Sequence, residues 1–276
     1  MQKILAQLSD PHIRLPGQLA YRRVDTSAFL ADAVMSLQRL RQPPDAVVMT
    51  GDLTDFGRPD EYAQLRRLLE PLACPVYLMP GNHDDGEQLR RSFPEHAYLR
   101  QHPGVRVCYT VDLGGLRLVA LDTTVPNSSY GEVHDDQLRW LDTELKAAPT
   151  TPAIVALHHP PFVTRIGHMD DIGLVHGARA LEAVIARHPQ VERVIAGHLH
   201  RSIQVRWGGT IAMTAPAPAH QVALDLAPDA RSEFMMEPPG FLLHAWSPGA
   251  PVVTHLGFCG RFDGPYPFHD EGGLID

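Results

Sequence analysis

Short apolar runs alternate with segments of helical periodicity along most of the chain. Apolar residues spaced by three and four positions predict helices, and short continuous apolar runs predict buried strands. Strands are predicted at residues 4–8, 46–49, 76–79, 107–111, 116–121, 153–157, 191–196, 203–205 and 210–213. Helices are predicted at residues 28–40, 60–72, 137–147 and 178–188. The pairs Gly114-Gly115 and Gly208-Gly209 are typical of the turns that close β-hairpins.

This alternation predicts an α/β fold built in layers. Strands that alternate with helices form sheets whose outer faces the helices cover. We therefore expect a four-layer αββα sandwich, with two mixed β-sheets flanked by helices, as a catalytic domain over residues 1–218. Beyond it, helical periodicity stops, and strands are predicted at 222–226, 241–246 and 252–256 between turns rich in Pro and Gly. Residues 219–276 are expected to form a small C-terminal β-rich extension, either a cap on the same domain or an oligomerisation element on a partner subunit.

Charge and composition exclude several classes of protein. The 276 residues include 24 Lys and Arg against 32 Asp and Glu, a net charge of −8, without a basic run. Proteins that bind a nucleic acid polymer need a basic surface, so that class is disfavoured. The apolar start of the chain is too short for a signal peptide, and the longest uncharged stretch contains Pro216 and Pro218, which argues against a membrane span. We expect a cytoplasmic protein without membrane partners.

Polar side chains follow five of the predicted strands, where each strand ends. They are Asp10 and His12; Asp52; Asn82 and His83; His158 and His159; and His198 and His200. In α/β sheets, ligands bind outside the carboxyl ends of the strands, so these five groups are expected to converge on one crevice. Residues two positions apart on extended backbone point to the same side. Asp10 and His12 are therefore expected to face the same crevice, and so are His198 and His200.

The converging side chains form a donor set for metal ions. Leaving His83 and His159 aside, it contains two carboxylates, one amide oxygen and four imidazoles, which exceeds what one tetrahedral zinc with an open position can use. Two ions that share a carboxylate use all seven donors, and paired metals are a known device for phosphoryl chemistry. The summed charge of two divalent ions, two carboxylates and a hydroxide is +1, which favours an anionic substrate. Singly, Asp10, Asp52 and Asn82 could each be ordinary turn residues, and only their joint occurrence argues for a site.

These five groups, in this order, resemble the calcineurin-like metallophosphoesterase superfamily. The segments Glu237–Phe241 and Gly260–Phe268 are similar to those of bacterial glycerophosphodiesterases and class III cyclic-nucleotide phosphodiesterases. The resemblance implies two divalent or trivalent metal ions, which could be iron, manganese, cobalt or zinc because mixed oxygen and nitrogen ligands accept all four. It also implies a homo-oligomer.

The resemblance further implies a role for each side chain. Asp10, His12 and His200 would hold the first metal, Asn82, His158 and His198 the second, and Asp52 would bridge them. His158 is preferred over His159 because the family pattern is a His, any residue, then Pro. His83 would stand near the leaving-group oxygen as the catalytic proton donor. His159, Ser129 and His220 resemble positions that contact the substrate or support the ligands, although a serine in such a loop is more often a turn hydroxyl than a substrate contact.

These observations predict a phosphodiesterase that hydrolyses a small diester, either a glycerophosphodiester or a 3′,5′-cyclic nucleotide. A metal lowers the pKa of bound water, which supplies hydroxide for attack on phosphorus. A phosphomonoesterase or a nucleotide-sugar pyrophosphohydrolase on the same scaffold is the alternative enzyme. A metal-binding regulatory module would not need His83, and a nuclease is disfavoured by the acidic charge.

Overall fold

Two β-sheets form the centre of the computed structural model, which describes residues 2–102, 104–271 and 273–274. The first sheet has the order β15 (Val253–Phe258), β14 (Gly240–Trp246), β1 (Lys3–Leu8), β2 (Ala46–Thr50) and β3 (Val76–Met79). Strands β1, β2 and β3 are parallel, whereas β14 and β15 are antiparallel to their neighbours. The carboxyl ends of β1, β2 and β3 therefore lie at the same edge of the sheet.

The second sheet is also mixed. Its order is β10 (Ile203–Trp207), β11 (Thr210–Thr214), β9 (Val191–Ala196), β7 (Ala153–Ala156), β5 (Arg117–Ala120) and β4 (Tyr109–Asp112). The four central strands are parallel, and the edge strands β4 and β10 join them through hairpins at the predicted glycine pairs, all of which have positive φ. Glycine fits there because it adopts positive φ without steric cost.

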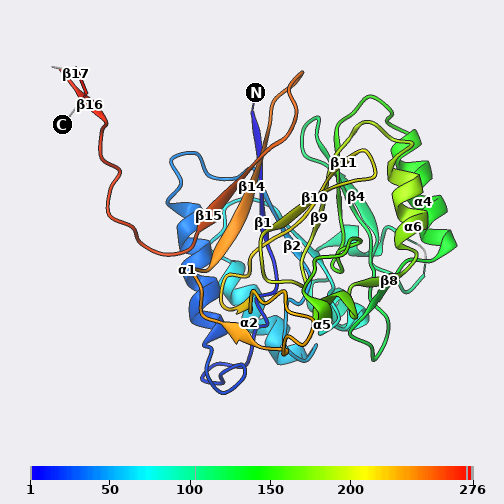
Figure 1. Ribbon diagram of the computed structural model, residues 1–276, viewed down its shortest axis with the longest axis horizontal. Helices are drawn as coiled ribbons and strands as arrows, with labels where there is room; N and C mark the ends of the chain where they lie inside the picture. Colours follow the sequence, from blue (N-terminus) through cyan, green and yellow to red (C-terminus); the bar gives the residue numbers. More distant parts are fainter. Residues whose placement is uncertain (1, 103, 272, 275–276) are drawn as a thin grey trace.

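Helices cover the outer faces of both sheets (Figure 1). Helices α1 (Thr26–Gln38) and α2 (Pro59–Leu69) lie on one side, and α4 (Asp135–Lys146) and α6 (Ala178–Ile185) on the other. Strand β5 shows why the sheets sit in the middle: Leu118 and Ala120 belong to the core that includes the first sheet, whereas Val119 between them packs in the core beneath α4 and α6. The prediction of two mixed sheets between helices is confirmed.

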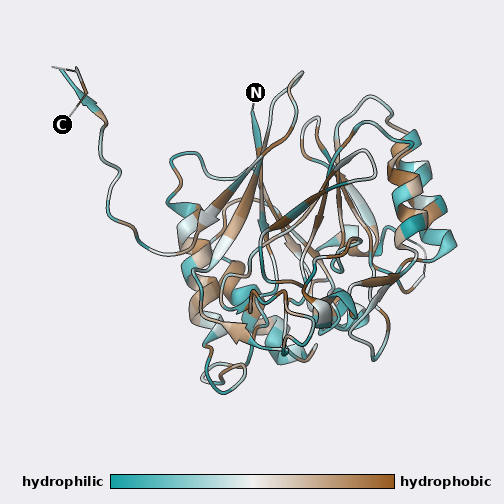
Figure 2. Ribbon diagram, in the orientation of Figure 1, coloured by the Kyte–Doolittle hydropathy of each residue, from teal (hydrophilic) through white to brown (hydrophobic). Residues whose placement is uncertain are grey.

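The colouring of Figure 2 shows the same division, with apolar strands inside and polar residues on the outer sides of the helices. In α4 the buried apolar residues Leu138, Leu141 and Leu145 recur at helical spacing, so one stripe of the helix faces the sheet. In the described part of the chain, eight shorter elements were not predicted because they are too brief to show a period. They are α3 (Gly86–Ser92), η1 (Ala97–Arg100), α5 (Gly167–Asp170), β6 (Gly131–Glu132), β8 (Leu174–His176), β13 (Phe234–Met235), β16 (His269–Asp270) and β17 (Gly273–Leu274). Strand β12 (Gln221–Val222) contains only the first residue of the strand predicted at 222–226.

The C-terminal segment is divided between the first sheet and an extended arm. Strand β14 pairs with β1, and β15 pairs with β14, so residues 240–258 continue the first sheet. After β15 the chain runs away from the two sheets toward β16 and β17 (Figure 1). No helix in the described part of the chain is long and apolar enough to cross a membrane.

The predicted strand at residues 222–226 is wrong beyond Val222. Residues 223–226 leave the strand through a turn in which the Asp225 N–H donates to the carbonyl of Ala223, and Leu224 and Leu226 are each 60% exposed. The alternation of Val222, Leu224 and Leu226 resembles a half-buried strand, but no sheet in the described part of the chain buries the two leucines.

Candidate metal centre

Seven polar side chains of the predicted set meet where the two sheets end. Asp10 and His12 follow β1, Asp52 follows β2, and Asn82 follows β3, all from the first sheet. The second sheet supplies His158 after β7, and His198 and His200 after β9. All are buried except Asn82, which is half-buried.

The backbone at these strand ends is strained. Positive φ, uncommon for residues other than glycine, occurs at Asp10 (55°), His12 (44°), Asp52 (47°), His198 (70°) and His200 (51°). Backbone hydrogen bonds hold the conformation: the Asp10 N–H donates to the Gly51 carbonyl and the His12 N–H to the Asp52 carbonyl, each at 3.0 Å. Such strain persists only where the surroundings maintain it, and it concentrates at functional sites.

Two glycines permit the close approach of the strand ends. A Cβ atom on Gly81 would collide with Asp52, and one on Gly51 would collide with the ring of His158. Both positions therefore exclude larger residues, and their glycines let the groups from β2, β3 and β7 pack against one another.

The first cluster of donors contains Asp10, His12 and His200. The Nε2 atoms of His12 and His200 lie 3.2 Å apart. Asp10 Oδ1 lies 3.6 Å from His200 Nε2, and Asp52 Oδ2 lies 3.5 Å from His12 Nε2. Asp10 is itself held in place because both of its carboxylate oxygens accept a hydrogen bond from the His198 N–H, at 2.9 and 3.0 Å.

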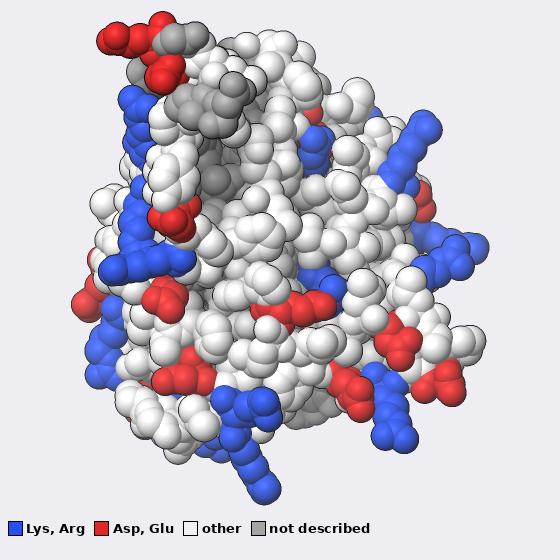
Figure 3. Space-filling view, turned by 60° about the vertical axis from the view of Figure 1, so that its left-hand side comes forward, with Lys and Arg blue, Asp and Glu red and all other residues white. Residues whose placement is uncertain are grey.

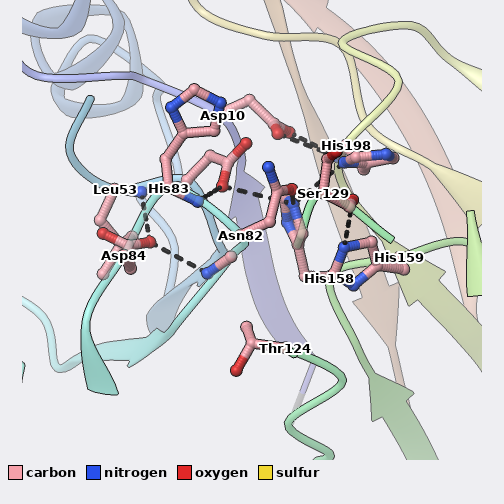
Figure 4. A network of polar contacts seen from close by, with 12 residues as sticks. Asp10, Leu53, Asn82, His83, Asp84, Thr124, Ser129, His158, His159 and His198 are labelled. Carbon is pink, nitrogen blue, oxygen red and sulfur yellow. Dashed lines mark hydrogen bonds and ion pairs between the residues drawn. The ribbon is translucent and has the colours of Figure 1, made fainter. Parts of the chain in front are cut away.

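The second cluster surrounds His158 Nε2 (Figure 4). Asn82 Oδ1 lies 3.0 Å from this atom and His198 Nδ1 lies 3.2 Å from it. Asp52 Oδ1 lies 3.4 Å away. The two oxygens of Asp52 thus face different clusters.

The donor set fits metal ions. Nitrogen and oxygen ligands lie about 2.0–2.2 Å from a bound zinc, so two ligands of one ion are separated by roughly 3–3.5 Å. The nitrogen pairs at 3.2 Å have this spacing. In addition, His158 Nδ1 faces the Thr50 carbonyl at 2.8 Å and His200 Nδ1 faces the His220 carbonyl at 3.1 Å. Such bonds to one ring nitrogen leave the other free to bind a metal.

Burial and neighbouring charges set the protonation of the centre. Burial raises the pKa of Asp10 to about 6, although His158 opposes the change. Burial also tends to raise the pKa of Asp52, but the neighbouring His158 and His83 outweigh this effect and hold the pKa well below its usual value. For His158, burial acts downward, but the carboxylates of Asp52 and Asp10 outweigh it and raise the pKa to about 9. Burial and the neighbouring His158 lower the pKa of His198 to about 3. Without metal, the centre therefore combines ionised Asp52 and protonated His158 with neutral His198, and a metal that binds His158 must displace its proton.

His83 lies beside the clusters without joining either of them. Its backbone N–H donates to Asp52 Oδ1 at 2.9 Å, and its ring Nδ1 faces the Asp55 carbonyl at 3.0 Å. The side chain is 34% exposed and lines a cleft of ≈ 450 Å³ together with Asn82 and His200. His83 can therefore meet a molecule that enters the cleft.

The three remaining predicted residues lie around the clusters. His159 is buried, with Nδ1 2.8 Å from Thr123 Oγ1 and Nε2 3.1 Å from the Ser129 carbonyl, so both ring nitrogens are engaged by the protein. Ser129 and His220 line the cleft. The His220 ring packs against His200 with centroids 4.7 Å apart.

Sequence reasoning missed several residues that shape the centre. Asp84 accepts hydrogen bonds from the N–H groups of Leu53 and Gly81, both at 2.9 Å, and so ties together the loops after β2 and β3. Asp55 faces both His12 and His83. Tyr21 lines the cleft. Asp55 follows the predicted ligand Asp52 by three positions, and Asp84 follows the predicted ligand Asn82 by two. This closeness in sequence was the one feature that could have pointed to them.

The comparison with protein families identifies the type of centre. The sequence model described as calcineurin-like phosphoesterase matches residues 4–202, which contain all seven clustered side chains. The chain belongs to the calcineurin-like phosphoesterase family. Calcineurin-like phosphoesterases use divalent metal ions, in agreement with the clusters of His and Asp.

Relatives of this calcineurin-like phosphoesterase extend the comparison beyond the family segment. A probable glycerophosphodiester phosphodiesterase from Arcobacter nitrofigilis is 38% identical over 274 residues, covering 99% of this chain and 100% of the relative. A probable cyclic nucleotide phosphodiesterase from Synechococcus sp. is 34% identical over 236 residues, covering 86% of this chain and 88% of the relative. A purple acid phosphatase from Lupinus luteus shares the fold, with a TM-score of 0.67 at 15% identity over 89% of this chain and 49% of that one.

Proposed function

We propose that this protein is a phosphodiesterase that hydrolyses small diesters, either glycerophosphodiesters or 3′,5′-cyclic nucleotides, at a centre of two metal ions. The ions would be iron, manganese, cobalt or zinc. The names of the two relatives support this substrate class. Because the matches cover 100% and 88% of these two relatives, the proposal extends to the whole protein and not to the family segment alone.

One observation carries the proposal: Asp52 lies between two histidine clusters and directs one oxygen to each. Oδ2 lies 3.5 Å from His12 Nε2, and Oδ1 lies 3.4 Å from His158 Nε2. A carboxylate in this position is suited to bridge two ions. Asp10, His12 and His200 would complete the first site. Asn82, His158 and His198 would complete the second.

The side chains of the cleft suggest how the reaction proceeds. When bound, a pair of ions supplies Lewis acidity that activates water and stabilises negative charge on the phosphoryl oxygens. Asn82 contributes a neutral oxygen, which keeps the centre positive for an anionic diester. His83 donates a proton to the departing alkoxide. Tyr21 and Phe234 line the same cleft and would partly shield the ester from solvent.

The first prediction concerns the type of ester. With Mn²⁺ present, bis(4-nitrophenyl) phosphate, a glycerophosphodiester and 3′,5′-cyclic AMP are expected to be hydrolysed faster than 4-nitrophenyl phosphate. Among the described residues, the cleft lining includes no Lys or Arg to pair with the second charge of a monoester. The measurement is kcat/KM for each ester at one metal concentration. A strong preference for the monoester would instead support the phosphomonoesterase alternative.

Hydrolysis assays with other substrates separate the remaining alternatives. On the face in Figure 3, Lys and Arg are interspersed with Asp and Glu and form no continuous basic stripe. Cleavage of single-stranded DNA at low salt would nevertheless favour a nuclease, and cleavage of a nucleotide sugar would favour a pyrophosphohydrolase. Metal binding without hydrolysis of any ester would favour a regulatory module.

The second prediction concerns the proton donor. His83→Ala is expected to retain the metals but to lower kcat by roughly 100-fold for a diester with an alkyl leaving group, since general acid catalysis commonly contributes this much. The effect on a 4-nitrophenyl leaving group should be much smaller because 4-nitrophenolate leaves without a proton. His255→Ala, exposed on β15, is the matched control. Equal losses for both leaving groups would remove His83 from this role.

Three wider expectations stay proposals. Residues 1–218 would act as the catalytic domain and 219–276 as its β-rich extension. A homo-oligomer would use the exposed apolar side chains of β15 and the arm, which include Leu256, Phe258 and Phe268. Action in the cytoplasm also stays a prediction.

A further inference from the structure

Gln7 carries a polar amide between the two β-sheets, and the proposed mechanism assigns it no role. It lies on β1 in the first sheet, and its Nε2 donates to the Ala196 carbonyl of β9 in the second sheet at 2.9 Å. The same Nε2 donates to Thr50 Oγ1, at the end of β2, at 3.0 Å. Gln7 is completely buried, and an amide buried without hydrogen bonds would cost free energy. One side chain thus ties together the ends of three strands.

The Ala196 carbonyl determines the proton positions in this network. A carbonyl oxygen only accepts hydrogen bonds, so the NH2 group of Gln7 faces it. The other end of the amide, Oε1, lies 3.2 Å from His244 Nε2 and also only accepts, so this nitrogen of His244 carries the ring proton. Burial lowers the pKa of His244 to about 3, so the ring is neutral and its Nδ1 accepts from the Thr254 hydroxyl, 2.9 Å away. His244 therefore holds the Gln7 amide in the one orientation that gives Ala196 a donor.

The two residues that Gln7 holds stand beside proposed ligands. The Thr50 carbonyl faces His158 Nδ1 at 2.8 Å, and His198 follows Ala196 by two positions. Each of the two clusters takes its donors from both sheets, so the fit of either ion depends on the separation of the strand ends. Metal–ligand distances tolerate only about 0.2 Å of variation, so a small change in that separation would weaken both sites.

We infer that Gln7 is a positioning residue that fixes the separation of the two halves of the metal centre, and that His244 fixes the orientation of Gln7. Strand β14, which carries His244 and pairs with β1 (Figure 1), thereby supports a centre to which it supplies no proposed ligand. The inference requires only that the clusters bind metal ions, and it holds whichever ester the protein hydrolyses.

Gln137 provides the control for a purely structural role. It too is completely buried, its Oε1 accepts from the His134 N–H at 3.1 Å, and its Nε2 donates to the Asp122 carbonyl at 2.6 Å. These partners lie outside both clusters. Methionine has a shape similar to glutamine but no amide, so Gln7→Met and Gln137→Met each leave hydrogen-bonding groups without partners. Both variants are expected to lower the stability of the metal-free protein.

The test compares Gln7→Met with Gln137→Met in the full chain, after bound metal is removed by chelation. Calorimetric titration with Mn²⁺ is expected to show affinity weakened by roughly 10-fold in Gln7→Met, the lower end of the usual effect of losing an outer partner of a metal ligand. Gln137→Met should keep the native affinity although urea titration shows its loss of stability. Native affinity in Gln7→Met, or an equal loss in Gln137→Met, overturns the inference.

A second pair of variants tests the role of His244 and serves if Gln7→Met does not fold. His244→Gln keeps an N–H near the position of Nε2 and should keep the native affinity for Mn²⁺. His244→Leu cannot donate to Gln7 and should bind Mn²⁺ more weakly, so equal affinities in these two variants overturn the inference. Weakened Mn²⁺ binding in Gln7→Met, together with hydrolysis of no ester by the native protein, overturns the proposed function but supports the inference.

Discussion

Replacement of Asp52 by asparagine is expected to lower kcat/KM for a phosphodiester by more than about 100-fold. Loss of a group that only supports a metal ligand commonly costs up to roughly 100-fold, and Asp52 is proposed to contact both metals directly. Asparagine keeps the shape but removes the negative charge and presents a poor ligand on its NH2 side. The two clusters would lose the carboxylate that directs one oxygen to each of them.

Metal content separates this effect from unfolding. After dialysis against limiting Mn²⁺, Asp52→Asn should retain fewer ions than the native protein. The matched control is Asp122→Asn, because Asp122 is also a buried carboxylate but accepts hydrogen bonds from the N–H groups of Val107 and Thr124, outside the two clusters. Native metal content and turnover in Asp52→Asn would contradict the bridging role.

The proposed ligands could be predicted because each follows a strand that its own residues reveal. The runs at residues 46–49 and 76–79 are short and apolar, and a predicted ligand, Asp52 or Asn82, follows each run at the third position. Parallel strands bring such ends to one edge. The position of each ligand shortly after a strand was therefore enough to predict that the ligands meet in space.

Other features depend on contacts that local sequence does not show. Strand β14 inserts between β1 and β15, with Leu5 opposite His244, and the pairing joins segments more than 200 residues apart. Asp55 could not be distinguished from a turn residue, because its contact with His83 depends on how that ring, from another strand end, turns toward it. Leu224 and Leu226 show the opposite error: their spacing by two positions predicted a strand, but both side chains are exposed and the strand ends at Val222.

Removal of the metals is expected to give a protein whose stability falls between pH 6.5 and 9. His158 has a pKa raised from 6.5 to about 9 because, despite burial, Asp52 and Asp10 favour its protonated form. A group whose pKa rises on folding contributes stability that is full below its unfolded pKa and disappears as the pH passes its folded pKa. A rise of this size corresponds to on the order of 3 kcal/mol. His12, whose pKa is also raised, acts in the same direction.

Below pH 6.5 the opposite trend should appear. The pKa values of His198, His220 and His244 are lowered to about 3 by burial, so these rings must stay neutral in the folded protein, and acid favours unfolding. The metal-free protein should thus be most stable near pH 6.5, as urea titrations from pH 5 to 9.5 after chelation would measure.

Because a metal binds only neutral His158, the stability gained on adding Zn²⁺ should grow from pH 6.5 to 9, whereas the stability of the metal-free protein falls. Metal-free stability that rises over this interval would contradict the placement of His158 between two ionised carboxylates.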